Sequence, residues 1–74
     1  MVVEVRLFAT LREGRFKNRE MEFAEGGSLG DLLRGLRISA KEVGILLVNG
    51  KDASADRQLS ARDVVSVFPL IGGG

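Results

Sequence analysis

The chain has 74 residues, with 11 Lys and Arg against 10 Asp and Glu, and it contains neither cysteine nor histidine. This length fits one small domain, and the missing residue types exclude disulfides, thiolate nucleophiles and the commonest neutral-pH base and metal ligand. A net charge of +1 without Trp or Tyr argues against nucleic acid, and no apolar run approaches the roughly 20 residues that cross a bilayer. We therefore expect a soluble, cytoplasmic domain with no nucleic-acid or membrane partner, no bound metal and no autonomous catalytic machinery.

The first part of the chain predicts two strands. Residues 3–7 alternate apolar and charged side chains, which is the period of a half-buried strand. The same alternation returns at residues 20–23, where Met21 and Phe23 are the apolar members. The basic loop 9–18 lies between them, so we expect a hairpin with a long connection.

One helix is predicted after a pair of glycines at residues 26–27. Ser28 is a candidate N-cap, and Asp31 stands where it can complete a capping box. We interpret this pair as a cap and not as a hydrolytic dyad. A shorter helical turn is expected at residues 39–43. The apolar face of the main helix is a stripe with helical spacing, formed by Leu29, Leu32, Leu33 and Leu36.

The second half predicts further strands and closes the fold. The apolar run at residues 45–48 predicts a buried strand, and the following Asn49-Gly50 fits a type I′ hairpin turn. Residues 52–58 allow a poor return strand at most, whereas residues 64–68 predict the last strand. A mixed sheet of four or five strands, with its first and last strands parallel at the centre and the helix across it, buries the leucine stripe. The predicted class is α+β, a ubiquitin-like β-grasp.

The β-grasp domain is expected over residues 1–68, followed by a flexible tail at residues 69–74. The tail ends in Gly72, Gly73 and Gly74, which contribute no packing surface because glycine has no side chain. Such a segment can enter a narrow channel and present its terminal carboxylate to another protein's active site. By themselves, the glycines fit a frayed terminus without function equally well.

Apolar residues near the end of the last strand are expected to bind a partner. Alternation turns two aromatic rings to the sheet face opposite the helix, where exposed aromatic pairs often mark contact sites. The alternative, which the sequence leaves open, is that loop 9–18 covers these rings. The basic residues of that loop are expected to be solvated. The predicted partner-binding residues are Phe8, Phe68, Pro69, Leu70 and Ile71.

Several segments together resemble the MoaD and ThiS sulfur carriers. The step Phe68-Pro69 is more similar to the small subunit of molybdopterin synthase than to the thiamine-pathway carrier. Lys51 and Asp52 depart from the family pattern, which often has an apolar residue at this point. The segments that carry the resemblance are residues 5–13, 28–33, 47–50 and 59–69 followed by the glycines.

The resemblance implies chemistry that is performed on this protein by others. A ubiquitin-activating-type enzyme, similar to MoeB or ThiF, would use ATP to adenylate the carboxylate of Gly74, and a sulfur donor would convert it to a thiocarboxylate. Gly72 and Gly73 would give the tail access to the active sites of its partner proteins. The loaded tail would then insert into a larger, MoaE-like synthase subunit and give its sulfur to a cyclic pterin precursor in molybdenum cofactor biosynthesis. The chain would be the sulfur-carrying subunit of that synthase, with no permanently bound cofactor.

Three other functions stay open at this point. The chain could serve thiamine thiazole synthesis or another sulfur-transfer pathway. A second alternative is a protein modifier whose Gly74 forms isopeptide bonds with lysines. The third is a β-grasp interaction module that is never activated.

Overall fold

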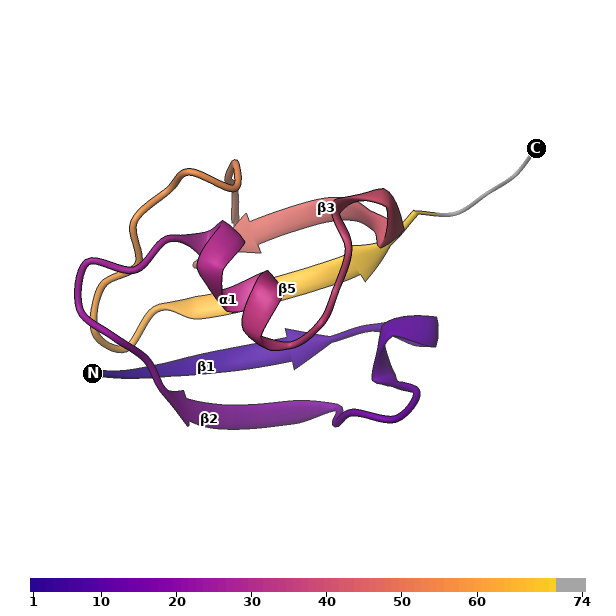
Figure 1. Ribbon diagram of the computed structural model, residues 1–74, viewed down its shortest axis with the longest axis horizontal. Helices are drawn as coiled ribbons and strands as arrows, with labels where there is room; N and C mark the ends of the chain where they lie inside the picture. Colours follow the sequence, from indigo (N-terminus) through magenta and orange to yellow (C-terminus); the bar gives the residue numbers. More distant parts are fainter. Residues whose placement is uncertain (71–74) are drawn as a thin grey trace.

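The computed structural model describes residues 1–70 of the chain. This part contains one α-helix, two short 3-10 helices and five strands, and the α-helix crosses the sheet (Figure 1). In chain order, the elements are β1 (Val2–Leu7), η1 (Ala9–Arg12), β2 (Asn18–Glu22), α1 (Leu29–Gly35), η2 (Ala40–Glu42), β3 (Val43–Val48), β4 (Lys51–Asp52) and β5 (Val64–Pro69).

Within residues 1–70, the strands form one mixed sheet in the order β2-β1-β5-β3-β4. The first and last strands, β1 and β5, are parallel neighbours at its centre, with Leu7 opposite Val67. The other neighbouring strands are antiparallel. This arrangement confirms the predicted β-grasp. The α1 crossover makes it possible, because it lets strands from both ends of the sequence pair in parallel.

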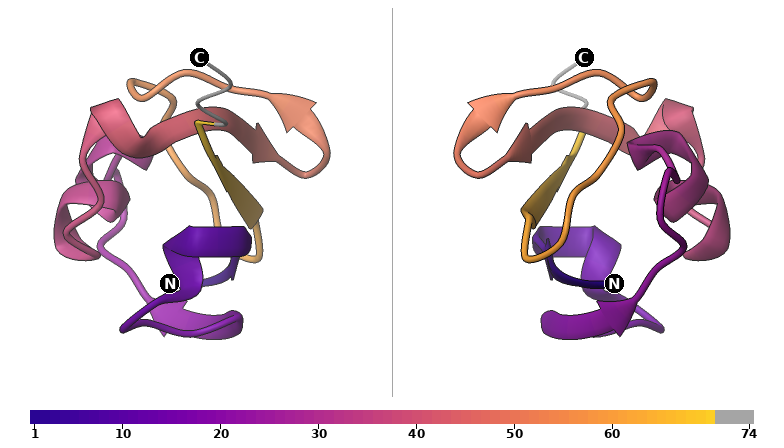
Figure 2. Two further views of the ribbon diagram at one scale, coloured as in Figure 1. Left: turned by 90° about the vertical axis from the view of Figure 1, so that its right-hand side faces the viewer. Right: turned by 90° about the vertical axis from the view of Figure 1, so that its left-hand side faces the viewer.

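The core lies between α1 and one face of the sheet, and Figure 2 shows α1 on that side of the sheet. Alternate residues of β1 and β5 point to this side, where they meet the leucines of α1. The removal of these apolar side chains from water is the main favourable contribution to folding. The five inward-facing strand residues are all 0% exposed: Val3, Val5, Leu7, Val65 and Val67.

Local signals set the start of α1 and the β3–β4 turn as predicted. Ser28 and Asp31 form a reciprocal capping box: the Ser28 hydroxyl accepts from the Asp31 amide at 3.2 Å, and Asp31 Oδ2 accepts from the Ser28 amide at 3.0 Å. The hydrogen bonds from Ser28 lower the pKa of Asp31, and Arg34 adds a smaller lowering effect. At the hairpin, Asn49 and Gly50 have φ angles of 53° and 81°, as a type I′ turn requires.

The strands have somewhat different bounds from those predicted: β1 begins at Val2, and β5 extends to Pro69, which was expected to begin the tail. β3 begins at Val43, and the prediction that the run 45–48 is buried is wrong for Ile45, which is 50% exposed. The physical reason is that α1 covers only one face, so alternate residues of β3 face solvent. The return strand is β4 rather than residues 52–58, and β2 ends at Glu22.

Candidate functional site

The predicted aromatic pair lies on the sheet face that α1 does not cover. Phe8 follows β1 and Phe68 lies in the neighbouring β5, and their rings stack with centroids 4.1 Å apart at an interplanar angle of 10°. The Phe8 amide also donates to the Val67 carbonyl oxygen at 3.2 Å, which extends the parallel ladder to this point. Both rings stay partly exposed. Stacking therefore presents one continuous aromatic surface.

Loop 9–18 places one cation over the Phe8 ring and leaves both rings partly exposed. Leu11 of η1 turns into the core, and the Arg12 guanidinium lies 5.5 Å from the centroid of the Phe8 ring. Arg12 Nε donates to the Leu7 carbonyl oxygen at 2.8 Å, which fixes the cation beside the aromatic pair. Arg15 differs from the expected solvated state, since it donates to the carbonyl oxygens of Leu36 and Arg37 after the helix.

Two residues that the sequence analysis missed extend the apolar surface. Ile45 of β3 lies opposite Phe68, and Leu47 lies opposite Ser66, so both face away from α1. The continuous apolar run suggested burial on both faces. The signal that could have found them was the presence of only one strong amphipathic helix, which can cover one face at most. We call this surface the open-face patch, made of Phe8, Ile45, Leu47, Phe68 and Leu70.

The open face is polar towards its β2 edge. Glu4 of β1 pairs with Arg6 at 2.6 Å, and the neighbouring β2 residue opposite Glu4 is Glu20. Alternation places these side chains on the same face as the aromatic pair. The patch is therefore bordered by charge on one side, which is the common arrangement of an apolar contact centre and a polar rim.

The patch borders the point where the chain leaves the sheet. β5 continues through Pro69, which lies opposite Val43 and is partly exposed. The amide of Leu70 donates to the carbonyl oxygen of Glu42 at 2.8 Å, and the Leu70 side chain is 64% exposed. The predicted site residues Ile71, Gly72, Gly73 and Gly74 lie outside the described residues, so their roles remain predictions.

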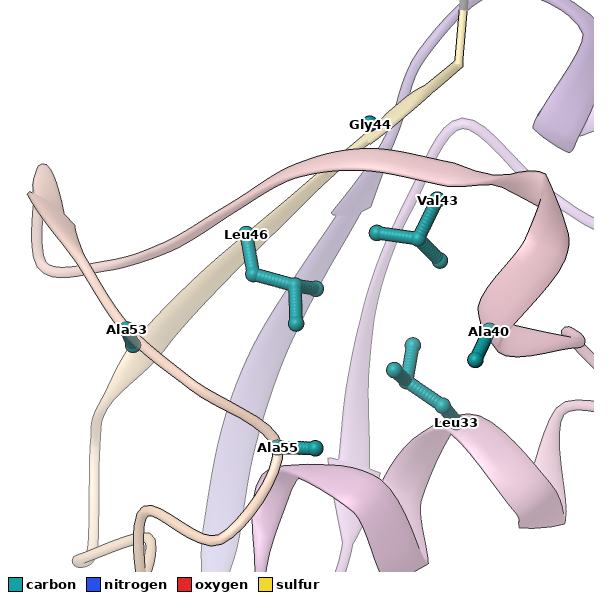
Figure 3. A pocket seen from close by; sticks show the side chains of 7 residues that line it. All are labelled: Leu33, Ala40, Val43, Gly44, Leu46, Ala53 and Ala55. Carbon is teal, nitrogen blue, oxygen red and sulfur yellow. The ribbon is translucent and has the colours of Figure 1, made fainter.

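A hollow of about 260 Å³ lies on the other side of the sheet, between α1, η2 and β3 (Figure 3). Its lining is aliphatic and small, and it contributes no polar side chain that could orient a substrate. It is separate from the open-face patch. The lining residues are Leu33, Ala40, Val43, Gly44, Leu46, Ala53 and Ala55.

Within residues 1–70, the polar groups form no evident catalytic or metal-binding cluster, and the one buried charged side chain supports the fold. In this part of the chain, no three His, Cys, Asp or Glu side chains gather as a group that could hold a metal ion. Asp63 is buried and accepts hydrogen bonds from Asn49 and the Ser60 amide. No helix among these residues has the length and apolar character needed to cross a membrane. The feature of the described part that is suited to recognition is the open-face patch.

The sheet order and the crossing helix define the chain as a ubiquitin-like β-grasp protein. A family model described as the ThiS family matches residues 5–74. The chain belongs to the ThiS family, a family of ubiquitin-like sulfur carriers. A comparison with curated proteins gave no match.

Solved structures with the same fold include proteins of the molybdopterin converting factor. A putative subunit 1 from Pyrococcus furiosus is 28% identical, with a TM-score of 0.77 over 96% of this chain and 99% of that one. In a complex of subunits 1 and 2 from Helicobacter pylori, the matching chain is 28% identical, with a TM-score of 0.66 and full coverage of both chains. The HVO 2177 protein of Haloferax volcanii is 32% identical, with a TM-score of 0.80 over 100% of this chain and 87% of that one.

Proposed function

We propose that this protein is a sulfur carrier for molybdopterin synthesis and that the carboxylate of Gly74 is its reactive group. An activating enzyme joins this carboxylate to the adenylyl group of ATP and releases pyrophosphate. A sulfur nucleophile then attacks the acyl carbon, AMP leaves, and the product is a C-terminal thiocarboxylate. The adenylate is needed because a free carboxylate is a poor electrophile. Gly73 and Gly72 give the tail the slender form that both active sites require.

The observation that carries this proposal is the position of the open-face patch in a chain of the ThiS family. The patch surrounds the end of β5, so a partner that binds Phe8, Phe68, Pro69 and Leu70 also receives the segment beyond Leu70. Four residues make up this segment, which spans at most about 13 to 14 Å when fully extended. Ile71 is the first of these residues and is proposed to add to the contact.

This function requires two partners. The first is a ubiquitin-activating-type enzyme, similar to MoeB or ThiF, which binds the ATP. The second is a larger synthase subunit, similar to MoaE, and the relative from Helicobacter pylori supports it because its structure is a complex of subunits 1 and 2. The carrier itself holds no permanent cofactor. We place these reactions in the cytoplasm, and fractionation of cells that express the protein tests this location.

The molybdopterin branch is favoured by the relatives described as molybdopterin converting factor subunit 1 and by the Phe68-Pro69 step. The family model carries the ThiS name, and this observation supports thiamine thiazole synthesis as the second candidate. Purified synthase and thiazole-forming systems separate the two, because the loaded carrier should restore product formation in only the correct system.

Mass spectrometry of the full chain tests the common chemistry. After incubation with ATP, a sulfide source and a MoeB-like or ThiF-like enzyme, we expect the mass change of one sulfur replacing one oxygen. A variant that lacks Gly74 should show no change. Conjugates to lysine would instead identify a protein modifier, and an unchanged mass with both activating enzymes would leave only an interaction module.

A further inference from the structure

The ladder between β3 and β5 changes register where the chain leaves the sheet. Ile45 lies opposite Phe68 and Val43 lies opposite Pro69, so Gly44 is an extra residue on β3. One extra residue on one strand is a β-bulge, which bends the strand and increases its local twist. The Leu70 amide then donates to the Glu42 carbonyl oxygen at 2.8 Å.

Gly44 is required here for its lack of a side chain. A Cβ atom at this position would lie 2.7 Å from the Pro69 carbonyl oxygen and 3.0 Å from the Leu70 Cα atom. Both neighbours are backbone atoms, which cannot rotate away as the end of a side chain can. Gly44 is not among the residues with positive φ, so the requirement is for space and not for an unusual conformation. Any side chain would separate β5 from β3 at this point.

The acceptor for Leu70 is itself held by a second capping box. The Ser39 amide donates to Glu42 Oε2 at 2.8 Å, and the Lys41 amide donates to the Ser39 hydroxyl at 3.1 Å. These bonds hold the single turn of η2 and therefore the position of the Glu42 carbonyl group. Figure 1 shows η2 beside the end of β5. We call the Glu42 carbonyl and Gly44 together the tail seat.

We propose that the tail seat sets the direction in which the C-terminal segment leaves the sheet, and that Gly44 is a positioning residue for the modification of Gly74. This inference rests on the proposed function. Gly74 lies four residues beyond Leu70, so displacement of Leu70 changes where that segment starts relative to a partner bound at the open-face patch. Orientation contributes strongly to catalysis, and a misplacement of about 1 Å can lower a rate by about 100-fold.

Amide hydrogen exchange tests the tail seat without any assumption about function. In the wild-type protein, we expect the Leu70 amide to be protected from exchange by its hydrogen bond to Glu42. Gly44→Ala should remove that protection and leave the Phe8 amide, which bonds to Val67, protected as before. Gly35→Ala is the matched control, because a Cβ atom at Gly35 meets nothing within 4 Å. Protection of Leu70 in Gly44→Ala equal to that of the unmodified protein would overturn the inference.

Steady-state kinetics of thiocarboxylate formation test the functional consequence. Gly44→Ala should lower the kcat of the activating enzyme by about 10- to 100-fold because the carboxylate is misplaced. The change in KM for the carrier should be smaller, because Phe8 and Leu47 of the open-face patch lie away from Gly44. Gly35→Ala should keep both values. A Gly44→Ala protein that loses Leu70 protection yet keeps the normal kcat would contradict the positioning role and leave the proposed function intact. If the wild-type protein forms no thiocarboxylate, the proposed function fails instead.

Two variants of Leu70 give the same test without any change in β3. Leu70→Pro removes the N–H that binds Glu42, whereas Leu70→Ala keeps it and removes only the exposed side chain. We expect a higher KM for both variants and a reduced kcat for Leu70→Pro alone. Equal kcat values for the two variants would overturn the inference, even if Gly44→Ala does not fold.

Discussion

The two faces of the central strands differ sharply although their residues alternate along the same chain. On the covered face, Val5, Leu7 and Val67 are 0% exposed beneath α1. On the open face, Phe8 and Phe68 stack on each other and stay partly exposed. Both faces are apolar at this end of the sheet, but within the described residues only the covered face packs against a helix.

This difference assigns the two faces separate roles: the covered face stabilises the fold, and the open face is available for recognition. The covered face contributes free energy of folding because its side chains leave water when α1 packs against them. The open-face patch contributes less to folding and remains available to another protein. Substitutions on the two faces should therefore affect different measurements, and the separation can be tested from the largest expected effect to the smallest.

Leu7→Ala should have the largest effect, because it leaves a cavity in the covered face. We expect the free energy of unfolding to fall by about 2 to 5 kcal/mol, as for other buried leucines. Urea denaturation measures this change. Ile45→Ala is the comparison on the open face. If Ile45→Ala destabilised the protein as strongly as Leu7→Ala, the proposed difference between the two faces would be wrong.

Ile45→Gln should weaken binding of the larger synthase subunit with little loss of stability. A central apolar contact at an interface carries enough energy for the Kd to rise by about 10- to 100-fold. Titration calorimetry gives this value. Val2→Gln is the matched control, because Val2 is 41% exposed on the same face but lies at the other end of β1. Equal losses of affinity for the two variants would show that the patch is not the contact.

Asp63→Ala should destabilise the fold and leave the affinity of the open-face patch unchanged. Asp63 accepts from Asn49 Nδ2 at 2.9 Å and from the Ser60 amide at 2.8 Å, and both donors would lose their partner. We expect a loss of about 1 to 3 kcal/mol. Combination with Asn49→Ala in a double-mutant cycle should give less than additive losses. Additive losses would argue against this hydrogen bond.

Protonation of Asp31 should have the smallest effect, which is a small loss of stability in acid. The hydrogen bonds from Ser28 hold the pKa of Asp31 in the folded protein below its unfolded value of about 3.9. The contribution is thus complete above that pH and is lost as the pH falls towards the folded pKa. Denaturation across this range should show a smaller acid loss for Asp31→Asn than for the unmodified protein. Parallel curves would contradict the linkage.

Short-range patterns made much of the fold predictable from the sequence. The capping box of Ser28 and Asp31 and the turn at Asn49-Gly50 involve residues at most three positions apart, so the local sequence specifies them. The alternation in the first and last strands predicted which side chains are buried. It also placed Phe8 and Phe68 on one face, although only the structure gives their stacking. The family is recognisable from the sequence for a related reason, since its motifs run along almost the whole chain.

Contacts between distant segments required the tertiary structure. The exposure of Ile45 depends on which face α1 covers, and a run of apolar residues does not contain that information. The need for glycine at position 44 arises from the backbone of Pro69 and Leu70, which are far from it in the chain. By itself, the sequence determined the class of fold and the family. Tertiary structure alone decided which apolar residues form the open-face patch and how β3 holds the end of β5, because these properties depend on packing between strands that are neighbours only after folding.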